Sequence, residues 1–517
     1  MRRTFRILFA NCTLALFTAI AAQANCVNPT GSGGCFSSIQ AAVSAAAPGE
    51  TVRVDSGTYF ETVAITTPGI TLLGATAKKV ILDPGPPNSG NGIDILANNV
   101  MLRKLTIRNG TADGIAVASG VTGTRILKVT VIGAEDDCIN IRGSHTVVKN
   151  STLRSCSSQL LQVNADDVTI QKNSLSESNN RCLAGTGTNI GVVNNDMSTC
   201  DGGCVDITGG NAQVAKNHMA SCSGNGIRTL GDTPSIVKNT LIGIRDAGIE
   251  VTCPAPPTTC DSDPARTIFT GGPGSAGCHQ FNGDQNNCMQ AWTIGFQGPA
   301  SCFFNANNNS CSGCGPANAN NGQCTNTCTD TNVCNGGLVS QNIVSKVTNE
   351  ECFILSASGT GLLVEQNSGS ECEDGGFHID GTGITLRKNT ASGNGTFSTS
   401  GNSGFEISGT DHVLEQNTAI GNIGDGFNID GTGHTLTKND AEENAGNGFD
   451  VEGDKISLTK NTAKENAKVG IAVNSPAQNT TVNKNTALDN RTDFCDEGTG
   501  TTTSGNMFGT TGPCFGN

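Results

Sequence analysis

The chain of 517 residues has few aromatic and few charged side chains: one Trp, one Tyr, 4% aromatic and 15% charged residues overall. Its 36% of hydrophobic residues is little for a layered core of this size. Long helices are excluded because Gly, Asn, Thr and Ser, which are poor helix formers, fill every segment. The net charge of −14 comes without clusters of Lys and Arg, which excludes ordinary nucleic-acid binding. The 67 glycines favour many short strands joined by turns.

No apolar run beyond the first 24 residues reaches the ~20 residues that a membrane-spanning helix needs, so no membrane insertion is expected. Residues 1–24 read as a secretory signal peptide: three arginines precede a mostly apolar stretch, and Ala22 and Ala24 form a small-x-small cleavage site. Loss of Cys12 with this peptide leaves an even number of cysteines. We therefore expect disulfide bonds in an oxidising compartment, with the protein secreted or periplasmic.

Short apolar strands recur about every 22 residues, and most are followed by an asparagine. These asparagines form two rows: Asn150, Asn173, Asn195, Asn217 and Asn239, then Asn367, Asn389, Asn417, Asn439, Asn461 and Asn485. Beside the second row runs a row of aromatic residues that ends in Ile471: Phe353, Phe377, Phe405, Phe427 and Phe449. So short a repeat cannot bury its own apolar face, so it must stack on its neighbours as a coil of parallel strands.

This pattern resembles the right-handed parallel β-helix of the pectin-lyase-like superfamily, over roughly residues 50–250 and 336–490. The resemblance implies an all-β solenoid of about 15 turns of ~22 residues, with ladders of stacked apolar and Asn side chains. The C-terminal repeats also resemble the β-helix domain of periplasmic copper-binding proteins and of many exported repeat proteins, as in NTASGN, NTAIGN and NTAKEN. A monomer is expected.

The period and the cysteines divide the chain into six expected parts. They are a signal peptide (1–24), an N-terminal cap (25–50), a first β-helix block (51–252), a Cys-rich insert (253–335), a second β-helix block (336–490) and a C-terminal cap (491–517). The N-terminal cap is expected to hold a short helix with Ser37 as its N-cap residue and Ile39, Ala42 and Val43 on its buried face.

Cysteines are concentrated in the insert, where ten fall between Cys253 and Cys334 and predict a loop domain held by disulfides. Cys311 and Cys314 have zinc-like spacing there, but disulfides are favoured. The pairs expected elsewhere, although sequence does not fix connectivity, are Cys26–Cys35, Cys138–Cys156, Cys182–Cys204, Cys200–Cys222 and Cys495–Cys514. The six histidines show no paired metal spacing, which speaks against zinc or copper.

Alignment of the turns places one residue of each turn in a common row, two positions before the first inward apolar side chain. The row consists of Asn91, Asp113, Asp137, Gln159, Arg181, Gly203 and Asn225. Asp113 and Asp137 thus lie one above the other, with Asp136 and Glu135 alongside. Carboxylates this close repel, so a cation binds them or one holds a proton. Three or four oxygen ligands on a rigid sheet suit calcium.

An ordinary role is also open for these residues, because Asp at a β-helix bend often accepts hydrogen bonds from backbone amides. For the outward row of the second block a solvated acidic face is expected: His378, Glu406, Asn428 and Asp450.

Two families of this superfamily share the acidic register. Family-3 pectate lyases are the better match, as in DGI (113–115), EDDCINIR (135–142), LLQVN (160–164) and Arg181, with Arg142 where Lys is usual and Gln159 where another Lys is expected. Polygalacturonases match in TADGI and DDC but would need a Gly-His-Gly turn and an Arg-x-Lys that are missing. The lyase resemblance implies β-elimination on an acidic polysaccharide, with calcium on Asp113, Glu135, Asp136 and Asp137 and with Arg181 or Arg142 as base.

Two alternatives stay open. One is a non-catalytic exported β-helix protein that binds a glycan or a protein partner through its insert and acidic face. The other is a polygalacturonase-like glycoside hydrolase.

Overall fold

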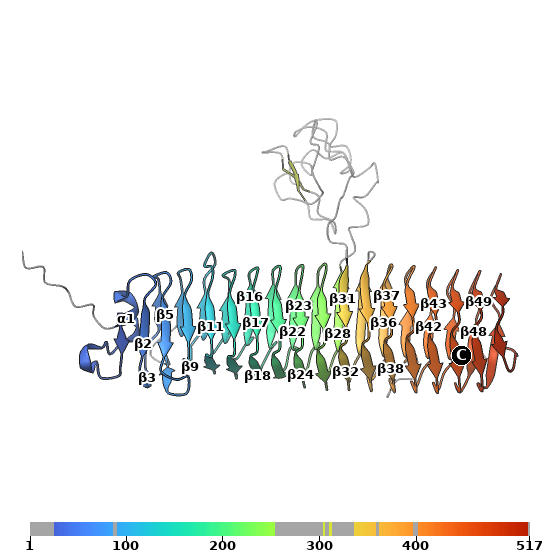
Figure 1. Ribbon diagram of the computed structural model, residues 1–517, viewed down its shortest axis with the longest axis horizontal. Helices are drawn as coiled ribbons and strands as arrows, with labels where there is room; N and C mark the ends of the chain where they lie inside the picture. Colours follow the sequence, from blue (N-terminus) through green and yellow to red (C-terminus); the bar gives the residue numbers. More distant parts are fainter. Residues whose placement is uncertain are drawn as a thin grey trace, which may run out of the picture.

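The computed structural model describes residues 25–85, 90–253, 336–357, 361–395 and 402–514, together with β29 (Phe303–Asn305) and β30 (Ser310–Ser312), which pair antiparallel. The described residues form a long rod of about sixteen stacked turns, which confirms the predicted parallel solenoid (Figure 1). The signal peptide expected at 1–24 and almost all of the predicted insert lie outside the described residues.

Each complete turn gives one short strand to each of three parallel sheets. Sheet I has sixteen strands: β4 (Val63–Ile65), β7 (Ile93–Ile95), β10 (Ile115–Val117), β13 (Ile139–Ile141), β16 (Leu161–Asn164), β19 (Leu183–Thr186), β22 (Val205–Thr208), β25 (Ile227–Leu230), β28 (Ile249–Cys253), β33 (Phe353–Ala357), β36 (Phe377–Gly381), β39 (Phe405–Ile407), β42 (Phe427–Ile429), β45 (Phe449–Val451), β48 (Val469–Val473) and β51 (Thr492–Asp496).

Sheet II has eighteen strands: β1 (Cys26–Val27), β2 (Thr51–Val54), β5 (Thr71–Gly74), β8 (Met101–Arg103), β11 (Arg125–Leu127), β14 (Val147–Lys149), β17 (Thr169–Gln171), β20 (Gly191–Val193), β23 (Gln213–Ala215), β26 (Ser235–Val237), β31 (Gly337–Ser340), β34 (Leu362–Glu365), β37 (Thr385–Arg387), β40 (Val413–Glu415), β43 (Thr435–Thr437), β46 (Ser457–Thr459), β49 (Thr481–Asn483) and β52 (Thr502–Ser504).

Sheet III completes each turn: β3 (Gly57–Tyr59), β6 (Val80–Leu82), β9 (Thr106–Arg108), β12 (Thr130–Ile132), β15 (Thr152–Arg154), β18 (Ser174–Ser178), β21 (Asp196–Cys200), β24 (His218–Ala220), β27 (Thr240–Ile242), β32 (Ile343–Ser345), β35 (Ser368–Ser370), β38 (Thr390–Ser392), β41 (Thr418–Ile420), β44 (Asp440–Glu442), β47 (Thr462–Lys464), β50 (Thr486–Leu488) and β53 (Met507–Phe508). The coil continues across residues 254–335, because β26, β27 and β28 pair in register with β31, β32 and β33.

The core is a narrow column inside the rod, filled by the inward side chains of the alternating strands. In the second block the predicted aromatic row is confirmed: neighbouring Phe rings from Phe353 to Phe449 stack with centroids 4.4–4.8 Å apart. Stacking of like residues is possible because parallel strands in register place equivalent positions one strand spacing apart.

The predicted asparagine ladder is present. Asn439 is typical: its Nδ2 donates to Oδ1 of Asn461 at 3.1 Å and to the Leu414 carbonyl at 3.0 Å. Asn150 does not belong to it, since Oδ1 of Asn173 accepts from the backbone N–H of Ser151 instead. A second ladder, which we did not predict, occupies another corner of the later turns and consists of Asn394, Asn422, Asn444, Asn466 and Asn490.

Disulfides hold that same corner in the earlier turns, and two predicted pairings are wrong. Cys26–Cys35, Cys138–Cys156 and Cys495–Cys514 are confirmed, but the other predicted pairs are replaced by Cys182–Cys200 and Cys204–Cys222, and Cys352–Cys372 is added. Residues 22 apart share a row and point the same way. Cysteines 18 residues apart instead meet at a corner of the coil. The first precedes a strand of sheet I, the second lies at or just past the end of the sheet III strand of the same turn, and their Cα atoms are 5.5–5.7 Å apart. Each bridge therefore closes one turn.

The N-terminal end of the rod is covered by α1 (Ile39–Ala45), preceded by the 3-10 turn η1 (Ser32–Gly34). The N-cap residue is Ser38 rather than Ser37: its Oγ accepts from the N–H of Ala41 at 3.1 Å. The predicted buried face of Ile39, Ala42 and Val43 is confirmed. Within the described ranges no helix has the length and apolar character needed to cross a membrane.

Candidate functional site

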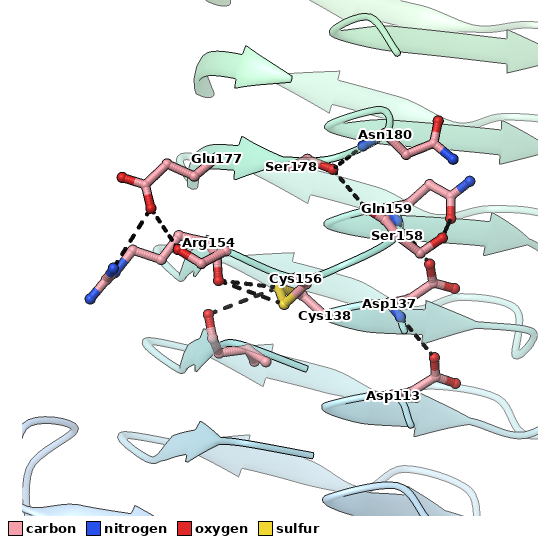
Figure 2. The surroundings of a disulfide bond; sticks show 12 residues. Asp113, Asp137, Cys138, Arg154, Cys156, Ser158, Gln159, Glu177, Ser178 and Asn180 are labelled. Atoms are coloured by element: carbon pink, nitrogen blue, oxygen red, sulfur yellow. Dashed lines mark hydrogen bonds and ion pairs between the residues drawn. A yellow bond between two sulfur atoms is a disulfide. The ribbon is translucent and has the colours of Figure 1, made fainter. Parts of the chain in front are cut away.

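The predicted row of bend residues on sheet I is confirmed. Ile93, Ile115, Ile139 and Leu161 pair in register, so the residues two positions before them stack as well. The backbone N–H of three row residues donates to the row side chain of the preceding turn: Asp113 to Asn91 (3.0 Å), Asp137 to Asp113 (3.2 Å) and Gln159 to Asp137 (3.0 Å). Figure 2 shows Asp113 and Asp137 one above the other in this ladder.

Three of the four predicted calcium ligands come together. One carboxylate oxygen each of Asp113, Asp136 and Asp137 lie within 4.8 Å of one another. Asp113 and Asp137 are 7% and 4% exposed, whereas Asp136 is exposed. Glu135 is not part of this group and lies exposed on the bend, and its neighbour Asp136 provides the third carboxylate.

The site brings three carboxylates together, and two of them, Asp113 and Asp137, are buried. Burial, followed by the charge of Asp113, raises the pKa of Asp137 to about 6. The pKa of Asp113 is also raised, mainly by burial, although the hydrogen bond from the Asp137 backbone opposes the shift. A bound cation would favour the ionised form of both groups.

Asn140 is the site residue that the sequence analysis missed. It occupies the outward position of β13, yet it is only 7% exposed, and its Nδ2 lies 3.4 Å from Oδ2 of Asp137. Its Oδ1 is buried and finds no hydrogen-bond partner within the described part of the chain. A buried amide oxygen without a partner is costly, so its presence beside two carboxylates points to a ligand. An Asn flanked by two isoleucines in the DDCINIR segment was the available indication.

A pocket of about 250 Å³ adjoins Asp113, one of the three aspartates. Its polar lining comes from Asn91, Asp94, Asp113, Asn140 and Arg142. Arg142 directly follows β13, and its positive charge lowers the pKa of Asp113 in part. The Asp113 carboxylate, the Asn140 amide and a positively charged side chain, Arg142, thus border one cavity on the outer face of sheet I.

The structure separates the two predicted basic residues. Arg181 lies two turns beyond Asp137 in the row, and its Nε is 3.1 Å from Oδ2 of Asp206. Arg228 continues this network, with Nη1 3.4 Å from Asp206 and Nε 3.2 Å from Glu250. Arg181, Asp206 and Arg228 line a different pocket of about 190 Å³. Because Asp206 holds its guanidinium away from the three aspartates, Arg181 is the weaker candidate for a base.

The acidic face of the second block is less solvated than predicted. Asp450 is only 3% exposed, and burial raises its pKa to about 7. Nδ2 of Asn474 donates to one of its oxygens. The expectation of a fully solvated face is wrong at this position.

Comparison with known families agrees with the architecture. The model of the right-handed beta helix region matches residues 137–287 and 403–510, which is half of the chain. The chain belongs to the right-handed β-helix family. This β-helix protein thus has the fold that its repeats predicted, within the pectin-lyase-like superfamily. No curated protein sequence matches it.

Solved structures resemble it only distantly. One is a mannuronic acid specific polysaccharide family 6 lyase from human gut microbiota (TM-score 0.37, 11% identity, 81% of this chain and 82% of that chain covered). Another is the A-module of a mannuronan C-5 epimerase from Azotobacter vinelandii (0.26, 12%, 92% and 94%). A third is the catalytic unit of a GH87 alpha-1,3-glucanase from Streptomyces thermodiastaticus (0.25, 13%, 92% and 67%). Likeness at this level carries no argument about activity.

Proposed function

We propose that this β-helix protein is an exported, cation-dependent protein acting on an acidic polysaccharide, most like a calcium-dependent pectate lyase. The observation that carries the proposal is the unpartnered Oδ1 of Asn140 beside the carboxylates of Asp113 and Asp137. The donor set consists of oxygen atoms on a rigid sheet, which suits calcium better than a transition metal. The disulfides of the rod support an oxidising compartment.

The cation answers the charge problem of an acidic protein that binds an acidic chain. With a net charge of −14, the protein would repel a polyuronate at long range. Calcium held by Asp113, Asp136 and Asp137 would neutralise the uronate carboxylate and make the adjacent carbon-bound proton more acidic. Asn140 would orient the carboxylates through its amide and offer its Oδ1 to the cation or to a sugar hydroxyl.

Arg142 is the proposed base for the elimination. It borders the same pocket as Asp113 and Asn140, whereas Arg181 is held by Asp206. The deprotonated guanidinium would take the proton next to the carboxylate, the bond to the leaving sugar oxygen would break, and a carbon–carbon double bond would form. The leaving oxygen would keep the bonding electron pair and take a proton from water. A free guanidinium stays protonated at neutral pH, so this step would be favoured at alkaline pH.

The test is the product formed from polygalacturonate or alginate with calcium at alkaline pH. A lyase releases unsaturated uronides, which absorb in the ultraviolet, whereas a hydrolase releases only saturated reducing ends. We expect the ultraviolet signal in the wild type, its loss in R142Q and on chelation of calcium, and its retention in R154Q, a control arginine on sheet III. Activity that survives in R142Q and is lost in R181Q would move the base to Arg181.

A hydrolase is the second candidate, and the raised pKa of Asp137 favours it, because a carboxyl that stays protonated near pH 6 suits a general acid. Saturated products with a bell-shaped acidic pH profile would support it. If no uronan yields either product, the non-catalytic glycan-binding alternative replaces both enzymes.

A further inference from the structure

A second group of metal-ligating side chains lies on the outer face of sheet I, in the second block. Glu351 stands two residues before β33, and His378 and Glu406 take the outward positions of β36 and β39. One ring nitrogen of His378 and one oxygen of each glutamate lie within 4.8 Å of one another. Six strand steps separate β33 from β13, roughly 29 Å at ~4.8 Å per strand, so the group is separate from the aspartate site.

The coil explains why sequence spacing did not reveal this group. The three residues are 27 and 28 positions apart, one from each of three successive turns. Parallel strands in register bring a bend residue of one turn beside the outward residue of the next. Asp113 and Asn140 stand in the same relationship in the first block. The absence of closely spaced histidine pairs in the sequence therefore does not exclude a metal site whose ligands come from different turns.

The charge on the two glutamates is not matched as it is elsewhere on this face. Asp206 and Glu250 pair with Arg181 and Arg228. In the described residues no Lys or Arg lies within ion-pair distance of Glu351 or Glu406, and their one basic neighbour is His378, with Nδ1 3.4 Å from Oε2 of Glu406. Burial raises the pKa of Glu351, and the charge of Asp374 adds to the shift.

An ordinary His–Glu ion pair would account for two of the three residues. This protein provides such a pair for comparison: Nδ1 of His218 lies 3.0 Å from Oδ1 of Asp196, both exposed on sheet III. No third ligand joins that pair among the described residues. Glu351, half-buried and with a carboxylate oxygen within 4.8 Å of a His378 ring nitrogen, is what distinguishes the group around His378.

We propose that Glu351, His378 and Glu406 form a binding site for a divalent transition metal, with zinc as the metal that fits best. Imidazole nitrogen combined with two carboxylates suits zinc, whereas calcium takes oxygen ligands alone. Zinc–ligand bonds of ~2.0–2.2 Å require the three ligand atoms to move closer together than they lie in this structure. Three protein ligands leave a fourth position of the tetrahedron for water or for a carboxylate or hydroxyl of a bound molecule.

The experiment is a zinc titration by calorimetry in excess calcium, so that oxygen-only sites are filled, repeated with Co²⁺ followed by its visible absorption. The wild type is expected to bind zinc at this site and to give a tetrahedral cobalt spectrum. H378Q and E351Q are expected to lose affinity at this site by at least ~100-fold, since loss of even an outer-shell partner costs ~10–100-fold. H218Q is the matched control and is expected to bind as the wild type does.

E406Q is a second variant in case H378Q does not fold, because Gln has nearly the same shape as Glu. E406Q is expected to lose the cobalt spectrum while its thermal unfolding transition stays unchanged. D137N is expected to leave zinc binding unaltered, which keeps this proposal independent of the calcium site. Absence of zinc binding in the wild type, or equal affinity in H378Q, E351Q and the wild type, would overturn it. Equal affinity in these three proteins is the result expected if cysteines elsewhere in the chain bind the zinc.

Discussion

The backbone N–H of Asp137 donates to Oδ1 of Asp113 at 3.2 Å, so the carboxylate of one turn supports the chain of the next. Asp137 does the same for Gln159 at 3.0 Å. One oxygen of each carboxylate thus accepts a hydrogen bond from a backbone amide of the next turn, which is the structural role that Asp often has at a β-helix bend. The two roles are separable by substitution: Asn keeps an acceptor for the ladder but removes the negative charge that a cation requires.

We predict that Asn140 contributes to cation affinity although it carries no charge. N140L removes the buried amide oxygen and should weaken calcium binding by about 10-fold or more, a size typical of residues that support a metal ligand. N140D should strengthen binding. Q162L is the control, since Gln162 is the neighbour of Asn140 in the outward row. Calorimetric titration measures all four proteins, and equal affinities in N140L and the wild type would exclude a role for the amide.

We predict that the Asn ladder dominates local stability. In N439A the N–H and Nδ2 of Asn417 lose an acceptor, and the carbonyl of Leu414 loses a donor. Each buried group left unpaired costs ~1–3 kcal/mol, so the free energy of unfolding should fall by about 3 kcal/mol or more. N428A, on the outer face of the adjacent strand β42, should change it by less than ~0.5 kcal/mol. Urea unfolding compares the two, and a similar loss in both would refute the ladder's importance.

We predict that His412 lowers the stability of the folded protein as the pH falls from about 6.5 to 4, against the opposite contributions of Asp137 and Asp450, whose pKa values are raised. Nδ1 of His412 accepts from the Ile384 backbone at 3.1 Å, and its Nε2 lies 2.7 Å from the Ser408 carbonyl, so the buried ring is held neutral. Burial, then His434, lowers its pKa from 6.5 to about 4. The unfolded chain therefore binds the proton first, and up to about 3 kcal/mol is lost across this window.

The check is the free energy of unfolding of the wild type and of H412Q from pH 7.5 to 4. H412Q should be less stable at neutral pH, and its change in stability between pH 6.5 and 4 should be less unfavourable than that of the wild type. H145Q removes an exposed histidine and should keep the slope of the wild type. An H412Q slope equal to that of the wild type would contradict this account.

We predict that peptide mapping of the unreduced protein links Cys182 to Cys200 and Cys204 to Cys222. Each bridge closes one turn, and removal of the second pair in C204S/C222S should lower the free energy of unfolding by ~2–4 kcal/mol. Peptides that join Cys182 to Cys204 would show that bridges run between turns instead.

Much of this molecule was predictable because parallel strands in register turn a sequence period into a spatial row. The stacking of Asp113 on Asp137, the Phe column and most of the Asn ladder followed from steps near 22 residues. The sequence analysis chose the wrong residue, one position away, for the helix N-cap (Ser38) and for one place in the Asn ladder (Ser151). Both positions depend on local backbone geometry, which the repeat period does not specify to a single residue.

The rest depends on how side chains point across the corners of the coil. The disulfides, the second Asn ladder and the contact between Asn140 and Asp137 each join two different rows, whose relative position a linear alignment does not give. Gly376 packs against the second Asn ladder, since a Cβ at this position would lie 3.0 Å from Nδ2 of Asn394.

Calcium titration of the wild type, D137N and D94N tests the central claim most directly. Asn at position 137 keeps an acceptor for the Gln159 backbone, and Asp94 lines the same pocket outside the three-aspartate group. We expect one calcium ion with a Kd of ~10⁻⁵–10⁻³ M, the range of extracellular sites, in the wild type and D94N, and no binding in D137N. Equal calcium affinity in D137N and the wild type would contradict the account.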